Sequence, residues 1–130
     1  MVFARVLLGI SGILFALYGL ACLFVPSLVA EASGLEMPNA SARAEVAAMY
    51  GGFQAGFGFF MLHCARRVST LRMGLWVLVT MVGSIGLGRA IGMLMQGASI
   101  YNLSAFAYEC ITSLLGLLAM RSLGDSKSEG

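Results

Sequence analysis

The chain has 130 residues, of which 59% are apolar and 11% are charged, and its mean hydropathy is +0.90. Soluble domains carry about 25% charged and 45–50% apolar residues, so this composition argues against a water-soluble globule and against a disordered chain. The net charge is only +2, and the basic residues form no stripe that would cover a phosphate backbone, so nucleic acid is not an expected partner. The sequence predicts one all-α domain in a lipid bilayer.

The first predicted element is a membrane span over residues 6–25. This uncharged run of 20 residues matches a bilayer core of ~30 Å and ends at Pro26. A signal peptide has a shorter apolar region of about 7–15 residues, so we expect the run to be retained as a span. The following segment, 26–41, is too polar to span and too long for a tight turn. We expect it to form a short helix at the outer membrane surface or a lid over the helices.

Three further spans are predicted over residues 43–65, 71–96 and 102–120. The span at 71–96 is interrupted by Arg89, and the span at 102–120 is interrupted by Glu109. Together with the first run, they predict an integral membrane four-helix bundle. The tail, 122–130, is small and polar, and we expect it to be frayed.

The placement of basic residues predicts how the spans are oriented. The loops at 26–41 and 97–101 contain no Lys or Arg. Most basic residues flank the other ends of the spans: Arg5, Arg66, Arg67, Arg72, Arg121 and Lys127. Because short cytoplasmic loops are enriched in Lys and Arg, we expect both termini to be cytoplasmic. The expected location is the inner (plasma) membrane, with several passes.

Small residues recur at helical spacing in all four spans. The stripes are Gly9, Gly12, Ala16 and Gly19; Gly52 and Gly56; Gly88 and Gly92; and Ala105, Glu109, Thr112, Ser113 and Gly116. Helices in lipid associate through such residues because their backbones can then approach closely. The stripes are expected to pack within one chain, although the same pattern serves homo-oligomers and membrane-protein partners.

The charges at membrane depth predict a buried ion pair. Arg89 lies seven residues before Gln96, and Glu109 lies seven residues after Asn102, so both sit ~10 Å below the outer boundary. An unpaired charge at this depth costs at least ~2.5–3.5 kcal/mol. We therefore expect an Arg89–Glu109 pair that faces the bundle interior. Such a pair fixes helix register, forms the polar end of a ligand cavity, or does both.

Other polar side chains are expected at about the same depth and complete a candidate cluster. Tyr18 and Tyr50 lie at that level, Gln54 lies one turn deeper, and Glu45 lies nearer the surface. Because a guanidinium has more donors than one carboxylate can use, further hydrogen bonds are expected. The predicted ligand-binding or buried polar cluster comprises Arg89, Glu109, Tyr50, Gln54, Tyr18, Glu45 and Arg43.

The sequence shows no pattern for catalysis, a cofactor or a metal. The cysteines are widely spaced within apolar runs, without disulfide or C-x-x-C spacing: Cys22, Cys64 and Cys110. The only histidine, His63, lies at the end of its span opposite to the polar cluster, so no base is near a serine there. We therefore predict no catalytic residue, no metal site and no cofactor. Whether the protein is an enzyme stays open, and the sequence favours that it is not.

Part of this pattern resembles a known family. The motifs are Arg43-Ala-Glu45, Tyr50-Gly-Gly-Phe-Gln54, Gly88-Arg89-x-x-Gly92 and Glu109. They are similar to those of a family of small bacterial membrane proteins described as a domain of unknown function, number 4345, which is akin to the DoxX-like proteins. The resemblance implies a four-span protein of the bacterial inner membrane, and it implies no substrate.

Three functions remain open from the sequence. The first is the binding of a small amphipathic or lipid-like molecule at the polar cluster, with entry from the outer leaflet. The second is an accessory or structural subunit of a larger membrane complex. The third is a proton-linked transporter or membrane enzyme that uses Glu109.

Overall fold

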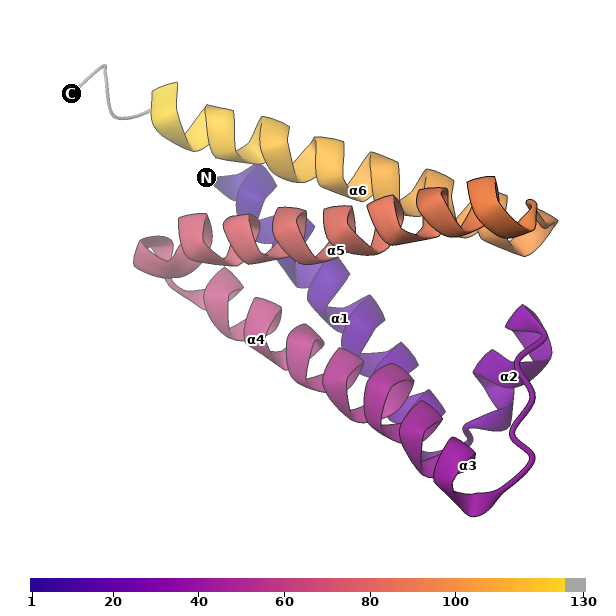
Figure 1. The fold of residues 1–130 in the computed structure, drawn as a ribbon. Coiled ribbons are helices and arrows are strands. Elements are labelled where there is room, and N and C mark those ends of the chain that lie inside the picture. Colours follow the sequence, from indigo (N-terminus) through magenta and orange to yellow (C-terminus); the bar gives the residue numbers. More distant parts are fainter. Residues whose placement is uncertain (126–130) are drawn as a thin grey trace. The chain divides into compact units, whose positions relative to one another are not determined.

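The computed structural model describes residues 1–125, and every regular element among them is helical (Figure 1). The elements are α1 (Val2–Phe24), α2 (Ser27–Ser33), α3 (Ala40–Val46), η1 (Ala47–Phe53), α4 (Gln54–Arg66), α5 (Val68–Gln96) and α6 (Ile100–Asp125). The all-α prediction is confirmed. The last helix continues past the predicted end at Met120, so the expected frayed tail is wrong for 122–125. The rest of that tail, 126–130, lies outside the described residues.

The chain forms two compact units, which are described separately. Unit 1 contains Met1–Leu8 and the chain from Cys64 onward, and unit 2 contains Gly9–His63. Helices α1 and α4 therefore each contribute to both units.

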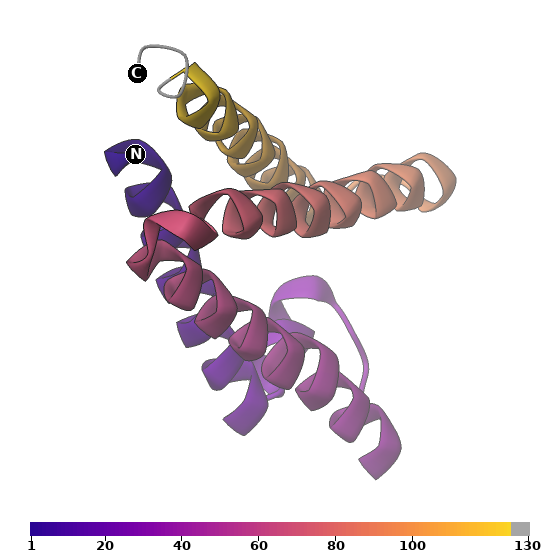
Figure 2. The ribbon, with the colours of Figure 1, turned by 90° about the vertical axis from the view of Figure 1, so that its left-hand side faces the viewer.

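In unit 2, α1 lies along η1 and α4 (Figures 1 and 2). A Cβ added at Gly19 would lie 2.8 Å from the carbonyl oxygen of Gly51, and one at Gly58 would lie 2.8 Å from Ala16 Cα. The two backbones are thus in direct contact, as the predicted stripe on α1 requires. Phe15 and Phe57 add an edge-to-face contact between the same helices, with ring centroids 5.0 Å apart.

The predicted stripe of Gly52 in η1 and Gly56 in α4 does not contact α1. A Cβ at Gly52 or Gly56 would meet nothing within 4 Å, whereas Gly51 and Gly58 contact α1. Gly52 is one residue from Gly51, and Gly56 is two residues from Gly58, so neither lies on the face that contacts α1. The predicted Gly9 contact is also absent, since a Cβ there would have open space.

The second predicted span consists of three consecutive helical elements rather than one α-helix. The seven residues of η1 form a π-helix between α3 and α4, and the three elements together cover residues 40–66. Asn39 begins this run by accepting a hydrogen bond from the Ala42 N–H at 2.9 Å, as N-cap residues do. Within the described part of the chain, three helices are long and apolar enough to cross a membrane: Val2–Phe24, Val68–Gln96 and Ile100–Gly124.

The segment between the first two predicted spans contains a short helix, as expected. Helix α2 covers Ser27–Ser33 and ends at Gly34, whose φ of 75° is the left-handed conformation that glycine adopts readily. The position of α2 at the outer membrane surface stays a prediction.

In unit 1, α5 and α6 pack against each other as antiparallel neighbours (Figure 1). Gly97, with φ 95°, ends α5, and α6 begins after a connection of three residues. A Cβ at Gly116 would lie 2.5 Å from Val79 Cγ2, so the predicted stripe on α6 does contact α5. The predicted Gly88-x-x-x-Gly92 stripe is not the surface of α5 that contacts α6, because α6 does not cover either glycine.

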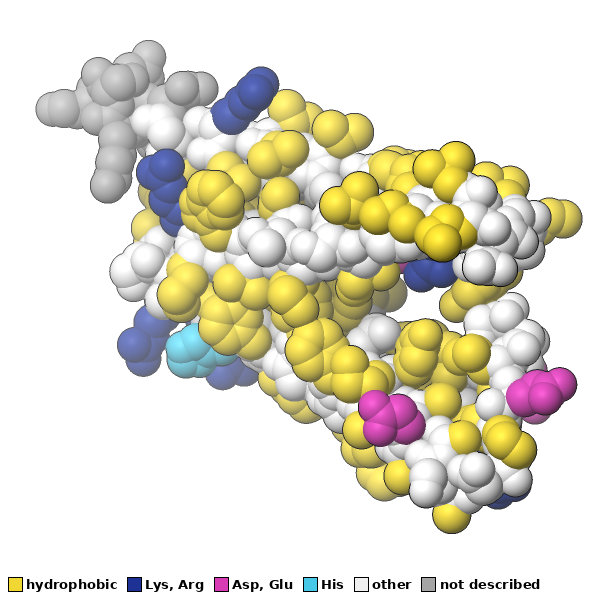
Figure 3. Space-filling view, viewed as in Figure 1, with side chains coloured by type: hydrophobic (Ala, Val, Ile, Leu, Met, Phe, Trp, Pro, Cys, Tyr) yellow, Lys and Arg dark blue, Asp and Glu magenta, His cyan; other side chains and the backbone are white. Residues whose placement is uncertain are grey.

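Large apolar side chains are exposed along the three long helices. Examples are Ile10 and Leu17 on α1, Trp76 and Leu87 on α5, and Ile111 and Leu118 on α6. Figure 3 shows hydrophobic side chains in many places on the visible face. Soluble monomers rarely expose apolar patches of this extent, whereas lipid solvates them well.

Candidate functional site

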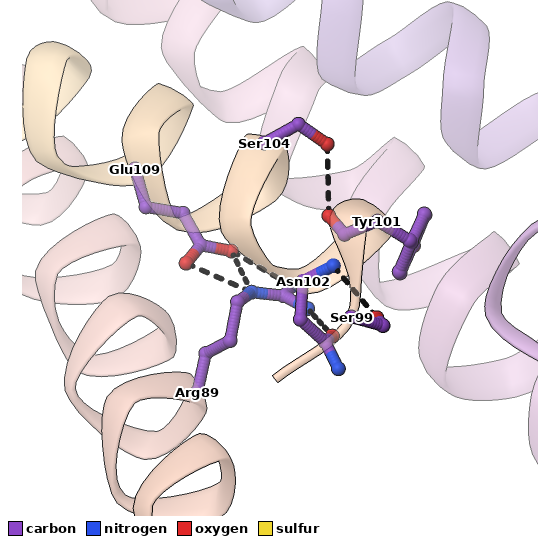
Figure 4. A network of polar contacts seen from close by, with 6 residues as sticks. All are labelled: Arg89, Ser99, Tyr101, Asn102, Ser104 and Glu109. Atoms are coloured by element: carbon purple, nitrogen blue, oxygen red, sulfur yellow. Dashed lines mark hydrogen bonds and ion pairs between the residues drawn. The ribbon is translucent and has the colours of Figure 1, made fainter. Parts of the chain in front are cut away.

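The predicted ion pair is present in unit 1. The Arg89 guanidinium on α5 donates from Nη2 to Glu109 Oε1 at 2.8 Å, and from Nε to both carboxylate oxygens at 3.0 Å (Figure 4). Glu109 lies on α6, so the pair joins the two antiparallel helices. A planar guanidinium that meets a carboxylate with two donors is the strongest form of this interaction.

The same arginine binds a third residue that the prediction had omitted. Arg89 Nη1 donates to Asn102 Oδ1 at 3.0 Å. Asn102 is held in turn at the start of α6, because its backbone N–H donates to Ser99 Oγ at 3.2 Å. The spacing contains a signal for this contact: Asn102 and Glu109 are seven residues apart, which places them on one face of a helix.

A glycine on α5 makes room for the carboxylate. A Cβ at Gly86 would lie 3.3 Å from Glu109 Cβ and 3.6 Å from its Oε2. Gly86 precedes Arg89 by three residues and lies on the same side of α5, so the helix has a recess where Glu109 enters. The two side chains of the pair are buried to different extents: the Glu109 side chain is 7% exposed, and the Arg89 side chain is 22% exposed.

An aromatic ring lies near the guanidinium. Arg89 Cζ lies 5.9 Å from the centroid of the Tyr101 ring, within the range of a cation–π contact. Figure 4 shows Tyr101 beside Asn102 at the start of α6. Besides Glu109, the guanidinium therefore has an amide and an aromatic ring as neighbours.

The remaining candidate residues belong to unit 2, and their approach to Arg89 stays a prediction. Tyr50 in η1 and Gln54 at the start of α4 are half-buried, and Tyr18 on α1 is 41% exposed. The expectation that Gln54 lies one regular α-helical turn from Tyr50 is wrong, because the π-helix changes the helical period between them. Arg43 and Glu45 on α3 are exposed.

The cysteines and metal-ligating residues show no further site among the described residues. Cys22 and Cys64 are buried and unpaired, and Cys110 is half-buried. Within residues 1–125, no group of three or more His, Cys, Asp or Glu side chains is placed to hold a metal ion.

The fold and this pair define the class of protein. Three helices long and apolar enough to cross a membrane, two of them joined by an arginine–glutamate pair, indicate an α-helical membrane protein. The model of the family described as "Domain of unknown function (DUF4345)" matches residues 3–120, and the chain belongs to that family. No curated protein and no solved structure was found to match the chain.

Proposed function

We propose that the protein is a four-span membrane protein with both termini in the cytoplasm. Residues 40–66 supply the fourth span, because α3, η1 and α4 follow one another without a break. At a rise of ~1.5 Å per residue this run approaches 40 Å, enough for a bilayer core of ~30 Å. The positive charges beside the α4–α5 corner support its cytoplasmic location.

Cysteine labelling tests this topology. We expect Ser69→Cys, in a variant without native cysteines, to react with a membrane-impermeant maleimide only after the cells are opened. Ser41→Cys is expected to react in intact cells, because it lies in the predicted outer segment. Both serines are exposed, so a lack of reaction reports the membrane side rather than burial. The reverse pattern would contradict the cytoplasmic orientation of the termini, and the same pattern at both positions would contradict a span between them.

The proposed function is the binding of a small amphipathic molecule beside Arg89, in the outer half of the bundle. The observation that carries it is the Arg89–Glu109–Asn102 network within two spanning helices. Arg89 and Glu109 carry opposite charges, so the network as a whole has no net charge. A bound anion would add an uncompensated charge at low dielectric, whereas a hydroxyl or carbonyl group adds only hydrogen bonds. The favoured ligand therefore has an uncharged polar head and an apolar body.

Native mass spectrometry of the gently purified protein tests this function. We expect the wild type to retain one uncharged amphipathic molecule. Asn102→Leu is expected to reduce its occupancy severalfold, because it removes an amide from the polar site and leaves the ion pair. Leu103→Ala is the matched control, since Leu103 is the next residue on α6 and is 53% exposed. Equal retention by both variants, or none by the wild type, would contradict the proposal.

A second candidate function is that of a subunit in a larger membrane assembly. The observation in its favour is that α6 leaves Gly88 and Gly92 on α5 uncovered. Small residues four apart on a spanning helix allow another helix to approach closely. The same spectra distinguish this function, because a retained protein mass in place of a small molecule would favour it.

A further inference from the structure

A second polar feature of unit 1 lies where α5 begins and α6 ends. Gly74 on α5 marks this end: a Cβ there would lie 2.9 Å from Leu8 Cδ1 and 2.6 Å from Cys64 Cβ. The first residues of α1, the end of α4 and the start of α5 therefore meet at this point. Arg89 lies fifteen residues further along α5, which corresponds to more than ~20 Å. The feature is thus separate from the candidate ligand site.

Exposed arginines surround this contact, and we call the set the basic end. Its members are Arg5 on α1, Arg66 and Arg67 at the α4–α5 corner, Arg72 on α5 and Arg121 on α6. Arg121 lies at a similar level because α6 runs antiparallel to α5, with Gly116 against Val79. Figure 3 shows Lys and Arg side chains over the start of α1, the α4–α5 corner and the end of α6.

The positive charge of the basic end has no acidic partner among the described side chains of unit 1. The one acidic side chain described in this unit is Glu109, and it is paired with Arg89. The corner itself is held in a fixed shape, because the Thr70 hydroxyl lies 3.0 Å from the carbonyl oxygens of both Cys64 and Arg67. The corner arginines therefore project from an ordered turn.

An exposed apolar surface adjoins these charges. Trp76 follows Arg72 by one turn of α5 and is 57% exposed, and Met73 beside them is 49% exposed. A tryptophan at this position is typical of the boundary between lipid headgroups and acyl chains. Positive charge next to an exposed apolar helix face matches a phospholipid, which presents a phosphate and acyl chains together. An acidic protein segment would match the charge alone.

We propose that the basic end binds an anionic phospholipid, with the phosphate held by the corner arginines. Arg66, Arg67 and Arg72 contact the headgroup, and the acyl chains lie along α5 beside Trp76. The occupant is a membrane lipid rather than a soluble phosphate, because the apolar surface gives a soluble ion no contact.

The test is a titration of the full-length protein in detergent with phosphatidylglycerol or phosphatidylcholine, read by native mass spectrometry. We expect the wild type to prefer phosphatidylglycerol. Arg66→Gln, Arg67→Gln and Arg72→Gln combined should lower its affinity by about 100-fold, since each basic residue near a lipid surface contributes roughly fivefold. Phosphatidylcholine binding should stay unchanged. The matched control replaces the same three arginines with lysine, which keeps the charge and most of the preference.

Three outcomes would overturn the proposal. The first is equal retention of both lipids by the wild type, and the second is an unchanged preference in the glutamine variant. The third is displacement of phosphatidylglycerol by soluble glycerol phosphate, which would assign the site to a free phosphate ester. If the glutamine variant fails to fold, the salt dependence of the wild type decides. Added salt should weaken phosphatidylglycerol binding and leave phosphatidylcholine binding unchanged.

Discussion

Replacing Glu109 with alanine is expected to destabilise the protein more than replacing Arg89 does, by about 1–3 kcal/mol. Glu109→Ala leaves a guanidinium that stays charged within the spanning helices and must find water or another acceptor. Arg89→Ala leaves a carboxyl group, which can be buried in its neutral, protonated form. The measurement is reversible unfolding of both variants in bicelles, followed by helical circular dichroism.

A conservative control separates charge from shape in this comparison. Glu109→Gln keeps the size of the side chain and an oxygen that can accept from Arg89, so it should destabilise less than Glu109→Ala. Equal losses in Glu109→Ala and Arg89→Ala would contradict the prediction, because a lone guanidinium at this position would then cost no more than a lone carboxyl group.

Adding one methyl group at Gly58 is expected to destabilise unit 2 by about 1–3 kcal/mol. A Cβ at this position would lie 2.7 Å from the carbonyl oxygen of Gly12 and 2.8 Å from Ala16 Cα, and neither backbone atom can rotate away. The helices α1 and α4 must therefore separate. Gly56→Ala, on the same helix, is the matched control because its Cβ would meet nothing within 4 Å.

The control should change stability in the opposite direction. Alanine is favoured over glycine inside a helix by roughly 0.5–1 kcal/mol, so Gly56→Ala should be neutral or stabilising. Thermal unfolding of the two variants, side by side in the same detergent, measures the difference. Similar unfolding temperatures would mean that α1 and α4 do not pack through Gly58.

The ion pair was predictable because charge and depth leave few choices. Arg89 and Glu109 are the only charged residues in the interior of their predicted spans, since Arg72 lies at the very start of the span 71–96. Equal distances from a short loop bring the two residues to one level. The energetic penalty for a lone charge in lipid then requires that they meet. Asn102 was predictable by the same geometry, but it had been treated as a boundary marker rather than as a side chain.

The packing faces were harder to predict than the helices. Glycine is frequent in these spans, so a four-residue spacing occurs on several faces and does not identify the one in contact. Gly51 and Gly58 face α1, whereas Gly52 and Gly56, which have the four-residue spacing, do not. The π-helix also changes the period within the second span, and no residue type in Ala47–Phe53 marks it in advance.

The most direct test of the central claim combines Arg89→Leu and Glu109→Leu in one protein and measures both stability and the retained small molecule. Removing both charges eliminates two desolvation costs together, so the double variant should recover much of the stability lost in Glu109→Leu alone. The account predicts a folded double variant whose native mass spectrum has lost the amphipathic molecule retained by the wild type. A folded double variant that retains the molecule at wild-type occupancy would contradict it, since the pair would then act only in holding α5 to α6.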